Sequence, residues 1–496
     1  MMISANYAMF LALFFPMSAV VLLGALRAFP LARDIVHIAT AVITFLLVVL
    51  LLIDFQNGEI AHLFLFEVMP GLPLYFALEP LGLIFALLAS GLWIAISVYA
   101  VGYMRKNGEE HQTRFAMFFT LAIAAALGIA FSGSLFTLFI FYEVLTLSTY
   151  PLVAHKGTRE ARSGARVYLT ILLSTSIGFL LPAIIWVWVA TGTMAFQPGG
   201  ILRDHIDPAL APFLLALFAF GIGKAALMPF HRWLPSAMVA PAPVSALLHA
   251  VAVVKGGVFA LLKISVYIFG TGYLSTTHAS VWLCWAAAIS IIVSAIIAMT
   301  KDDLKARLAY STVSQLAYVT LGVALANQMG MIGATMQIVM HAMAKITLFM
   351  CAGAIYVTAR KTKISEMTGL GRQMPFTFAA FLIASLSIIG LPPLGGAWSK
   401  WFLILGAVDA QQMIMIAVLA IGSMLSIGYL LPISAKAFFL APPQGASGKG
   451  IREAPLLLLV PLCVTAFGCL VLFGFANEIY NFLLHVPLLA PEGDTF

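Results

Sequence analysis

Long runs of apolar residues recur along the whole chain and are separated by short polar connections. Each run holds about 20 residues, the length that a helix needs to cross the hydrocarbon core of a bilayer. Because the runs are long and continuous, and not alternating, they favour membrane helices over strands. We predict fourteen such helices, at residues 7–26, 35–53, 78–101, 114–131, 133–154, 165–190, 210–230, 241–269, 279–299, 306–326, 331–357, 376–405, 411–437 and 455–476.

Composition supports a lipid bilayer as the surroundings of the chain. Of the 496 residues, 62% are hydrophobic and 9% are charged, whereas a soluble domain carries about 25% charged residues. No basic segment precedes the first apolar run, so we expect that run to be a retained helix and not a cleaved signal. The cysteines are scattered without metal-ligand spacing, so we expect no cofactor and no metal: Cys284, Cys351, Cys463 and Cys469.

The basic residues are distributed unevenly between the connections. Twenty of the 26 follow odd-numbered helices: Arg27, Arg33, Arg105, Lys106, Arg114, Lys156, Arg159, Arg162, Arg166, Arg232, Lys301, Lys305, Arg307, Arg360, Lys361, Lys363, Arg372, Lys436, Lys449 and Arg452. The opposite side receives Arg203 alone. Since positive loops stay in the cytoplasm, we expect both termini on the outer face of the membrane, which in a bacterium is the periplasmic face of the inner membrane. The net charge of +7 therefore reflects topology, and no nucleic-acid partner is expected.

The five remaining basic residues fall inside predicted helices: Lys224, Lys255, Lys263, Lys345 and Lys400. A charged side chain at bilayer depth costs about 2.5–3.5 kcal/mol on insertion scales, so each needs an explanation. We expect Lys263, near a helix end, to extend toward the membrane surface. Glu79, near the outer end of its helix, is expected at the membrane interface. The other four lysines are predicted to line a polar interior.

Glu143, His249 and His341 also lie at bilayer depth. His341 and Lys345 are four residues apart and share a helical face, whereas His249 and Lys255 diverge unless their helix is distorted. Burial lowers the pKa of a lysine and a nearby carboxylate raises it, so a lysine that gains and loses such a partner can exchange a proton. Arginine would stay protonated, and no arginine lies in mid-helix. The pattern favours proton transfer.

Proline interrupts two of the helices beside a buried lysine. In the seventh helix, Pro229 removes the N–H that would pair with the carbonyl of Ala225, close to Lys224. In the twelfth helix, Pro392–Pro393 and the glycines that follow precede Lys400. Within a membrane, such breaks are tolerated where protein or water satisfies the freed backbone groups.

The interrupted helices are five apart, which indicates two repeats of opposite topology. We therefore predict an all-α integral membrane protein of about fourteen transmembrane helices. It would contain two inverted five-helix repeats, helices 4–8 and 9–13, with helices 7 and 12 discontinuous. The expected units are the N-terminal helices 1–113, the first repeat 114–269, the second repeat 279–437, and the last helix with its tail, 455–496.

Four motifs contain the buried ionisable residues: FYE at 141–143, GKAALMPFHRWLPSAMVAPAPVSALLHAVAVVKGGVF at 223–259, HAMAKITLF at 341–349, and LPPLGG at 391–396 with Lys400. These motifs resemble the antiporter-like subunits shared by respiratory complex I and the Mrp-type cation/proton antiporters. The resemblance implies that Glu143 and Lys224 form a paired input site and that Lys400 is the terminal site. The residues that it assigns to proton translocation are Glu143, Lys224, His249, Lys255, His341, Lys345 and Lys400.

Within this family the overall pattern resembles D-type subunits of Mrp antiporters most, followed by N-type subunits. M-type subunits are less similar, because they usually have Glu where Lys400 stands. The resemblance implies an ion-transporting subunit, not an enzyme, that moves protons in exchange for Na⁺ together with other subunits. The alternative is a proton-pumping N- or M-type subunit of a complex I-like oxidoreductase or a membrane-bound hydrogenase. An independent solute carrier is disfavoured, since the sequence offers no organic-substrate site.

Overall fold

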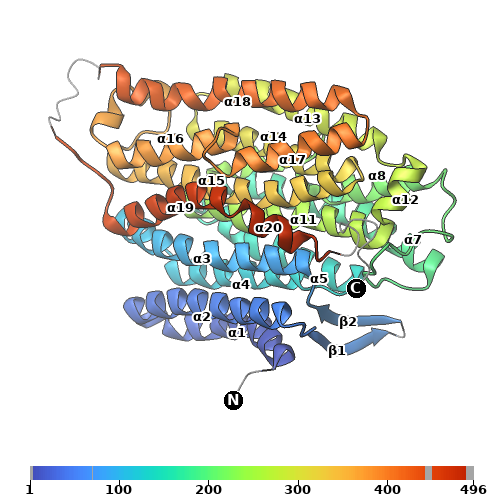
Figure 1. Cartoon of the computed structure of the whole chain (residues 1–496). Coiled ribbons are helices and arrows are strands. Elements are labelled where there is room, and N and C mark those ends of the chain that lie inside the picture. The colour runs from blue at the N-terminus through green and yellow to red at the C-terminus, as the bar shows by residue number, and fades with distance from the viewer. Residues whose placement is uncertain (1–3, 70, 442–449, 487–496) are drawn as a thin grey trace.

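The computed structural model describes residues 4–69, 71–441 and 450–486. Lys449 and the tail 487–496, which the sequence analysis included, lie outside these ranges. Within them, eleven segments are long and apolar enough to cross a membrane. Together with α14 (Leu304–Ala324) and the two interrupted helices, the described residues hold the fourteen segments that the sequence predicts. The helices lie side by side along one direction (Figure 1).

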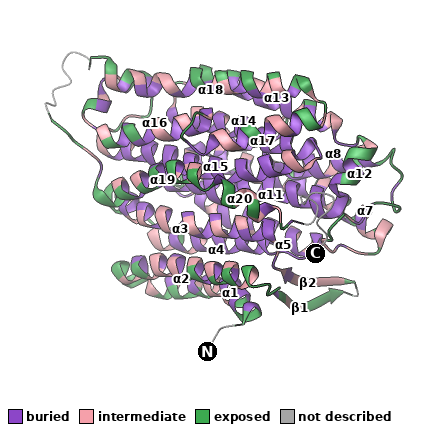
Figure 2. Cartoon of the chain, viewed as in Figure 1, coloured by how far each residue is buried: buried purple, intermediate pink, exposed green. Residues whose placement is uncertain are grey.

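The first two helices form a layer at one edge of the molecule and pack on the next two. Exposed residues line α1 and α2 (Figure 2), and many of them are large and apolar, as suits a lipid-facing layer. The four helices are α1 (Ala5–Ala25), α2 (Pro30–Gln56), α3 (Pro80–Asn107) and α4 (Gln112–Ala130).

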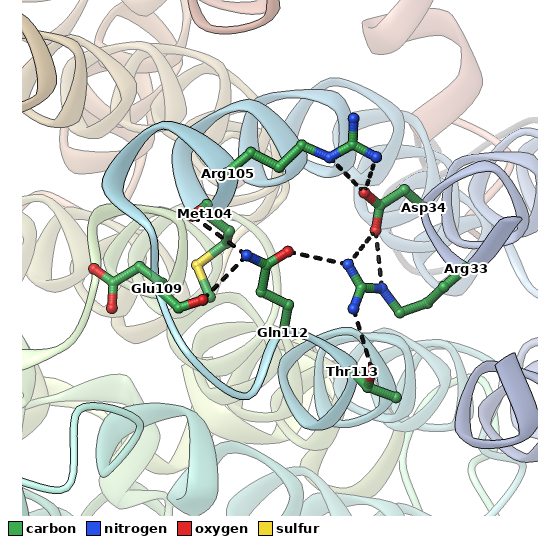
Figure 3. A network of polar contacts seen from close by, with 7 residues as sticks. All are labelled: Arg33, Asp34, Met104, Arg105, Glu109, Gln112 and Thr113. Atoms are coloured by element: carbon green, nitrogen blue, oxygen red, sulfur yellow. Dashed lines mark hydrogen bonds and ion pairs between the residues drawn. The ribbon is translucent and has the colours of Figure 1, made fainter. Parts of the chain in front are cut away.

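A buried ionic network fastens α2 to α3 and α4 (Figure 3). Asp34 accepts hydrogen bonds from Arg33 at 2.8 and 2.9 Å and from Arg105 of α3 at 2.5 and 2.9 Å. Arg33 also donates to Gln112 and Thr113 at the start of α4, at 3.0 and 3.1 Å. Every charge in the network has an opposite or polar partner, which the burial of ionic groups requires.

A β-hairpin stands between α2 and α3, and the sequence analysis did not predict it. Strands β1 (His62–Met69) and β2 (Leu72–Ala77) pair antiparallel. Ala77 N donates to Phe131 O at 2.8 Å, which fastens the hairpin to the turn after α4. We call this end of the molecule the hairpin end. The short helix α12 (Thr271–Thr277) lies at the same end (Figure 1).

The first predicted repeat corresponds to α4 and the elements that follow it up to Phe269. Two of its helices begin with a hydroxyl cap, because Ser134 and Thr158 accept hydrogen bonds from Thr137 N and Ala161 N. The helices after α4 are α5 (Leu135–Val153), α6 (Arg159–Thr175), α7 (Leu181–Thr191), α8 (Ala211–Gly221), α9 (Trp233–Ser236), α10 (Ala242–Ala246) and α11 (Val253–Ile264).

The second predicted repeat is built on the long central helix α15 (Gln328–Ala359), which packs against α14, α16, α17 and α19. Helices α11 and α15 are buried nearly all round (Figure 2), although each carries ionisable side chains on one face. The remaining helices are α13 (Val281–Thr300), α16 (Pro375–Ile389), α17 (Gly396–Asp409), α18 (Met413–Phe439), α19 (Leu456–Gly474) and α20 (Ala476–Leu483).

Both predicted interruptions are present. In the seventh helix, however, the interruption begins earlier than expected: α8 ends at Gly221, and Ala225 lies in a 3₁₀ turn, not in a helix kinked by Pro229. The next helix packs directly on this break, since a Cβ on Gly257 of α11 would collide with the backbone of Lys224. Glycine is therefore required where α11 crosses the break.

In the twelfth helix, residues 390–395 separate α16 from α17, as the sequence predicts. Gly390 ends α16 with a left-handed φ of 90°, which a glycine adopts without a steric penalty. The backbone oxygen of Ile389 is left free of helical partners at this end and faces a lysine side chain from α17. The break thus creates a polar site inside an apolar bundle.

Candidate functional site

Lys224 is fully buried beside the first break. Its Nζ donates to Tyr142 O at 2.8 Å and to Thr146 Oγ1 at 2.6 Å, and it lies 3.1 Å from the centroid of the Tyr142 ring. The backbone N–H of Lys224, freed by the end of α8, donates to the Tyr142 hydroxyl at 3.1 Å. One turn of α5 therefore provides hydrogen-bond partners both for the backbone N–H that the break leaves free and for the ammonium group.

Glu143 precedes Thr146 by about one helical turn on α5. Both of its carboxylate oxygens are buried, and within the described residues neither has a hydrogen-bond or ion-pair partner. Lys224 thus rests on neutral oxygens while a carboxylate without a partner stands close by on the same helix. The paired input site that the family resemblance implies stays a prediction.

Two other predicted lysines have the same surroundings as Lys224. Lys345 Nζ donates to Leu308 O at 3.2 Å and to Ser311 Oγ at 2.7 Å. Lys400 Nζ donates to Ile389 O and to Ser423 Oγ, both at 2.7 Å. Each of the three ammonium groups therefore contacts one backbone carbonyl and one hydroxyl. In the structure each hydroxyl accepts from the lysine and donates its own proton to another oxygen of the bundle. A hydroxyl can also donate to a neutral lysine, for which it would have to turn away from that oxygen.

The centre of the molecule joins the two repeats through a lysine and a histidine. Lys255 Nζ of α11 lies 2.5 Å from His341 Nδ1 of α15. His341 and Lys345 share a face of α15, as their spacing predicts. The structure therefore brings the three residues together at the contact between α11 and α15.

His249 lies in a π-helical turn, Leu247–Val251, just before α11. His249 and Lys255 are six residues apart and can face one another only if their helix is distorted, and this turn is such a distortion. The ring packs 4.6 Å from that of Phe349, and neither nitrogen has a hydrogen-bond partner within the described residues. Its bridging role stays a prediction.

A hydrogen-bonded link that the sequence analysis missed leads from the centre toward Lys400. Gln337 lies one turn before His341 on α15; its Nε2 donates to Gln315 Oε1 at 2.9 Å, and its Oε1 accepts from Ser399 Oγ at 2.6 Å. Ser399 directly precedes Lys400. The signal was available, since Gln337, His341 and Lys345 repeat at four-residue spacing along one helix face.

Lys400 borders a pocket of about 490 Å³ between α17 and α18, which opens to the outer surface of the bundle. The pocket is walled mostly by apolar side chains, among them Trp401, Met424 and Ile427. Tyr318 of α14 lies on the other side of the ammonium, with the ring centroid 5.1 Å from Nζ. Tyr142 and Tyr318 come from the second helix of each predicted repeat, so Lys224 and Lys400 have similar aromatic neighbours.

The expectation for Lys263 is wrong. Its side chain does not extend to the membrane surface but is fully buried and forms an ion pair with Glu79. The ammonium also donates to Ser132 O at 2.6 Å and to Ala130 O at 3.3 Å, at the C-terminal end of α4. The missed signal was Glu79 itself, whose position before α3 places a carboxylate at the same end of the bundle as Lys263.

The fold and the site define a class: multi-pass membrane proteins with two interrupted helices and buried ionisable side chains beside each break. The comparisons with known proteins identify the family. A family model described as "NADH:quinone oxidoreductase/Mrp antiporter, TM" matches residues 132–426, more than half of the chain. The chain belongs to this family and is an antiporter-like, multi-pass membrane subunit.

Relatives in the family come from both kinds of assembly. The chain is 33% identical over 425 residues to the NADH-quinone oxidoreductase subunit N of Desulforudis audaxviator (strain MP104C), with 83% of this chain and 84% of that protein covered. It is 30% identical over 465 residues to the A/B subunit of the probable K(+)/H(+) antiporter of Rhizobium meliloti (strain 1021). That match covers 91% of this chain and 45% of the relative.

A solved structure shows the same fold. In the structure of the Mrp complex from Dietzia sp. DQ12-45-1b, one chain matches with a TM-score of 0.84 and 22% sequence identity. The match covers 97% of this chain and 98% of that one. It extends the agreement in fold beyond residues 132–426 to nearly the whole length.

Proposed function

We propose that this chain carries protons through its line of buried lysines as part of a multisubunit monovalent cation/proton antiporter, with Na⁺ as the expected cation. The observation that carries the proposal is the common surroundings of Lys224, Lys345 and Lys400. Each ammonium contacts one carbonyl and one hydroxyl instead of a carboxylate. Lysines held in this way can lose a proton without leaving a buried anion unpaired.

Glu143 and Lys224 would form the input site. When the Lys224 ammonium moves from the oxygens of α5 toward the Glu143 carboxylate, it gains a counter-ion and holds its proton more strongly. When it moves back, it loses that counter-ion and releases the proton more easily. The proton would then pass to Lys255 and His341 at the centre, through Lys345, and on to Lys400. His249 would bridge between Lys224 and the centre.

The basic connections suggest the orientation. With positive loops in the cytoplasm, both termini and the hairpin end would face the periplasm of a bacterial inner membrane. Cysteines introduced at 155–165 should then react with impermeant thiol reagents from the cytoplasm, and cysteines at 192–206 from outside. Labelling of both connections from the same face would contradict the proposed orientation and the inverted repeats.

A proton-pumping component of a redox-driven complex is the second candidate, favoured by the 33% identity to a subunit N. The two functions differ in their partners, because redox chemistry would have to come from subunits that carry flavin and iron–sulfur groups. Purification of the native complex, followed by identification of its subunits, distinguishes the two functions. Flavin and iron–sulfur subunits in that complex would decide for the second candidate.

The central test uses vesicles that contain the assembled complex. We expect an Na⁺ or K⁺ pulse to dissipate an imposed pH gradient, and Glu143→Ala or Lys224→Ala to abolish the response while the complex still assembles on native gels. Glu160→Ala, at an exposed carboxylate in the first turn of α6, is the matched control. Wild-type exchange in assembled Glu143→Ala complex would contradict the input site.

A further inference from the structure

The Glu79–Lys263 ion pair stands apart from the residues assigned to proton transfer so far. It lies at the hairpin end, where α3 begins and α4 ends. Lys263 is fully buried, whereas the Glu79 side chain keeps 15% of its surface exposed. Glu79 is therefore the member of the pair whose side chain reaches the surface, while its Oε1, which contacts Lys263, is buried.

Helix α11 connects this pair to the centre of the molecule. Lys255, Phe259 and Lys263 follow one another at four-residue spacing in a single unbroken helix. With a rise of 1.5 Å per residue, the two lysines are about 12 Å apart along the axis, on a face that turns gradually from α15 toward α4. Lys255 contacts His341 at one end of this face, and Lys263 contacts Glu79 at the other.

Phe259 occupies the interval between the two lysines. It is buried and stacks on Phe85 of α3, with ring centroids 4.7 Å apart. Its own ring centroid lies 5.7 Å from Lys263 Nζ. Two stacked rings at this position form an apolar barrier, which a proton crosses only when the rings move apart and admit water.

Polar groups surround the pair on the side away from Phe259. The titratable groups that face Glu79 and Lys263 are the hydroxyls of Tyr267, on the π-helical turn after α11, and Tyr75, on β2. Tyr75 donates to Gly133 O at 2.5 Å, next to Ser132, whose carbonyl holds Lys263. The ring of Phe196 also packs against the pair, with its centroid 4.7 Å from Lys263 Nζ, so the surroundings combine these polar groups with an aromatic wall.

We infer that Glu79 and Lys263 are a proton-exchange site between Lys255 and the hairpin-end surface, with Phe259 as the barrier on that route. The inference rests on the proposed proton transport and adds an outlet in the first repeat that acts in series with Lys400, so that transport requires both. In the ion pair, the Lys263 ammonium gives its proton to the Glu79 carboxylate, which releases it to water and becomes an anion again. A proton that passes Phe259 through water then protonates the neutral Lys263 and restores the ion pair.

The first experiment removes the pair in the assembled complex. The double variant Glu79→Gln/Lys263→Met leaves no unpaired buried charge, so it tests the route without the desolvation cost that single variants carry. We expect assembly as in wild type and a loss of cation-driven proton flux of about 10²-fold, typical when a positioned proton-transfer group is removed. Glu59→Gln, at an exposed carboxylate just before the hairpin, is the control.

The second experiment opens the barrier. Phe259→Ala should give a proton leak in the absence of Na⁺ and K⁺, whereas Phe259→Leu, which keeps most of the apolar volume, should stay coupled. Adding Glu79→Gln/Lys263→Met to Phe259→Ala should abolish the leak. If the pair only fastens the hairpin, Phe259→Ala should not leak, and adding Glu79→Gln/Lys263→Met should not reduce any leak. If Phe259→Ala does not assemble, the cation-driven proton flux of Glu79→Gln/Lys263→Met tests the inference by itself.

The outcomes separate this inference from the proposed function. If wild-type vesicles show cation-driven flux and the double variant keeps it, the outlet is wrong and the transport function stands. A leak that persists in the triple variant also overturns the outlet. If wild-type vesicles show no proton flux with any cation, the proposed function fails first.

Discussion

Lys224 Nζ lies 2.6 Å from Thr146 Oγ1, and this contact between a buried ammonium and a hydroxyl is repeated at Lys345 with Ser311 and at Lys400 with Ser423. The three hydroxyls come from three different helices, α5, α14 and α18. A hydroxyl rotates freely enough to accept from the charged lysine and donate to the neutral one. If these lysines carry protons as proposed, the recurrence places a suitable hydroxyl beside each of them.

The first prediction concerns Thr146. Thr146→Val keeps the shape of the side chain but removes the hydroxyl, which leaves Lys224 with the carbonyl of Tyr142 alone. We expect a loss of proton flux of about tenfold or more, since an unsatisfied buried polar group costs about 1–3 kcal/mol. Flux is measured in vesicles from the decay of an imposed pH gradient after a cation pulse.

Two variants control the Thr146 experiment. Thr146→Ser keeps the hydroxyl and should keep the flux. Thr44→Val, on α2, removes a buried hydroxyl that has no hydrogen-bond partner in the described part of the chain, and should change nothing. Equal flux in Thr146→Val and Thr146→Ser would show that the hydroxyl has no role in transport.

The second prediction concerns the link between the centre and Lys400. Gln337→Leu removes the amide that joins Gln315 to Ser399, and both of those groups are buried. We expect slower proton transfer to Lys400 by about tenfold, because Gln315 and Ser399 lose the amide that links them by hydrogen bonds. The measurement is initial proton flux at saturating cation concentration.

Gln328→Leu, at the first residue of the same helix, is the matched control for Gln337. It changes the same side chain away from the link and should transport at the wild-type rate. If Gln337→Leu also keeps the wild-type rate, the amide link is not on the proton path.

The third prediction concerns the network that holds the N-terminal layer (Figure 3). Asp34→Asn removes the negative charge between Arg33 and Arg105. Removal of one partner from a buried ion pair costs about 3–5 kcal/mol, and we expect the lower part of that range because Arg105 is partly exposed. The thermal unfolding midpoint of the detergent-solubilised complex should fall by several degrees.

Glu109→Gln provides the comparison for Asp34→Asn. In the same network, Glu109 contributes its backbone oxygen to Gln112 and not its carboxylate, so the variant should unfold like wild type. An unchanged midpoint in Asp34→Asn would show that the ionic network does not stabilise the layer.

The sequence predicts the transmembrane segments and the buried lysines well, because each is a strong local signal: a long apolar run, or a charge within one. It does not predict the partners of those charges. Thr146, Ser311 and Ser423 are ordinary hydroxyl residues until the fold brings them to a lysine. Lys263 was misplaced for the same reason, since its partner Glu79 lies 184 positions earlier in the sequence. The hairpin was missed because its strands are apolar and short, and adjoin a predicted helix.

The last prediction asks what Lys400 contributes. Its ammonium is buried, lies beside the second break and borders the pocket between α17 and α18. If Lys400 is a proton-holding terminal site, titratability matters more than charge. Lys400→Met should be nearly inactive because it holds no proton, and Lys400→Arg should also be poor because its guanidinium stays protonated. Lys400→Glu should keep measurable flux with a shifted pH optimum.

Proton flux against pH, measured in vesicles with assembly checked on native gels, separates the four proteins. Lys436→Met, at an exposed position in the last turn of α18, controls for the loss of one positive charge and should transport normally. Because the Met side chain fills nearly the same volume as the lysine stem, its failure would reflect the missing amine and not a cavity. Wild-type flux in Lys400→Met would show that Lys400 is a packing residue, and the path would then have to leave the protein elsewhere.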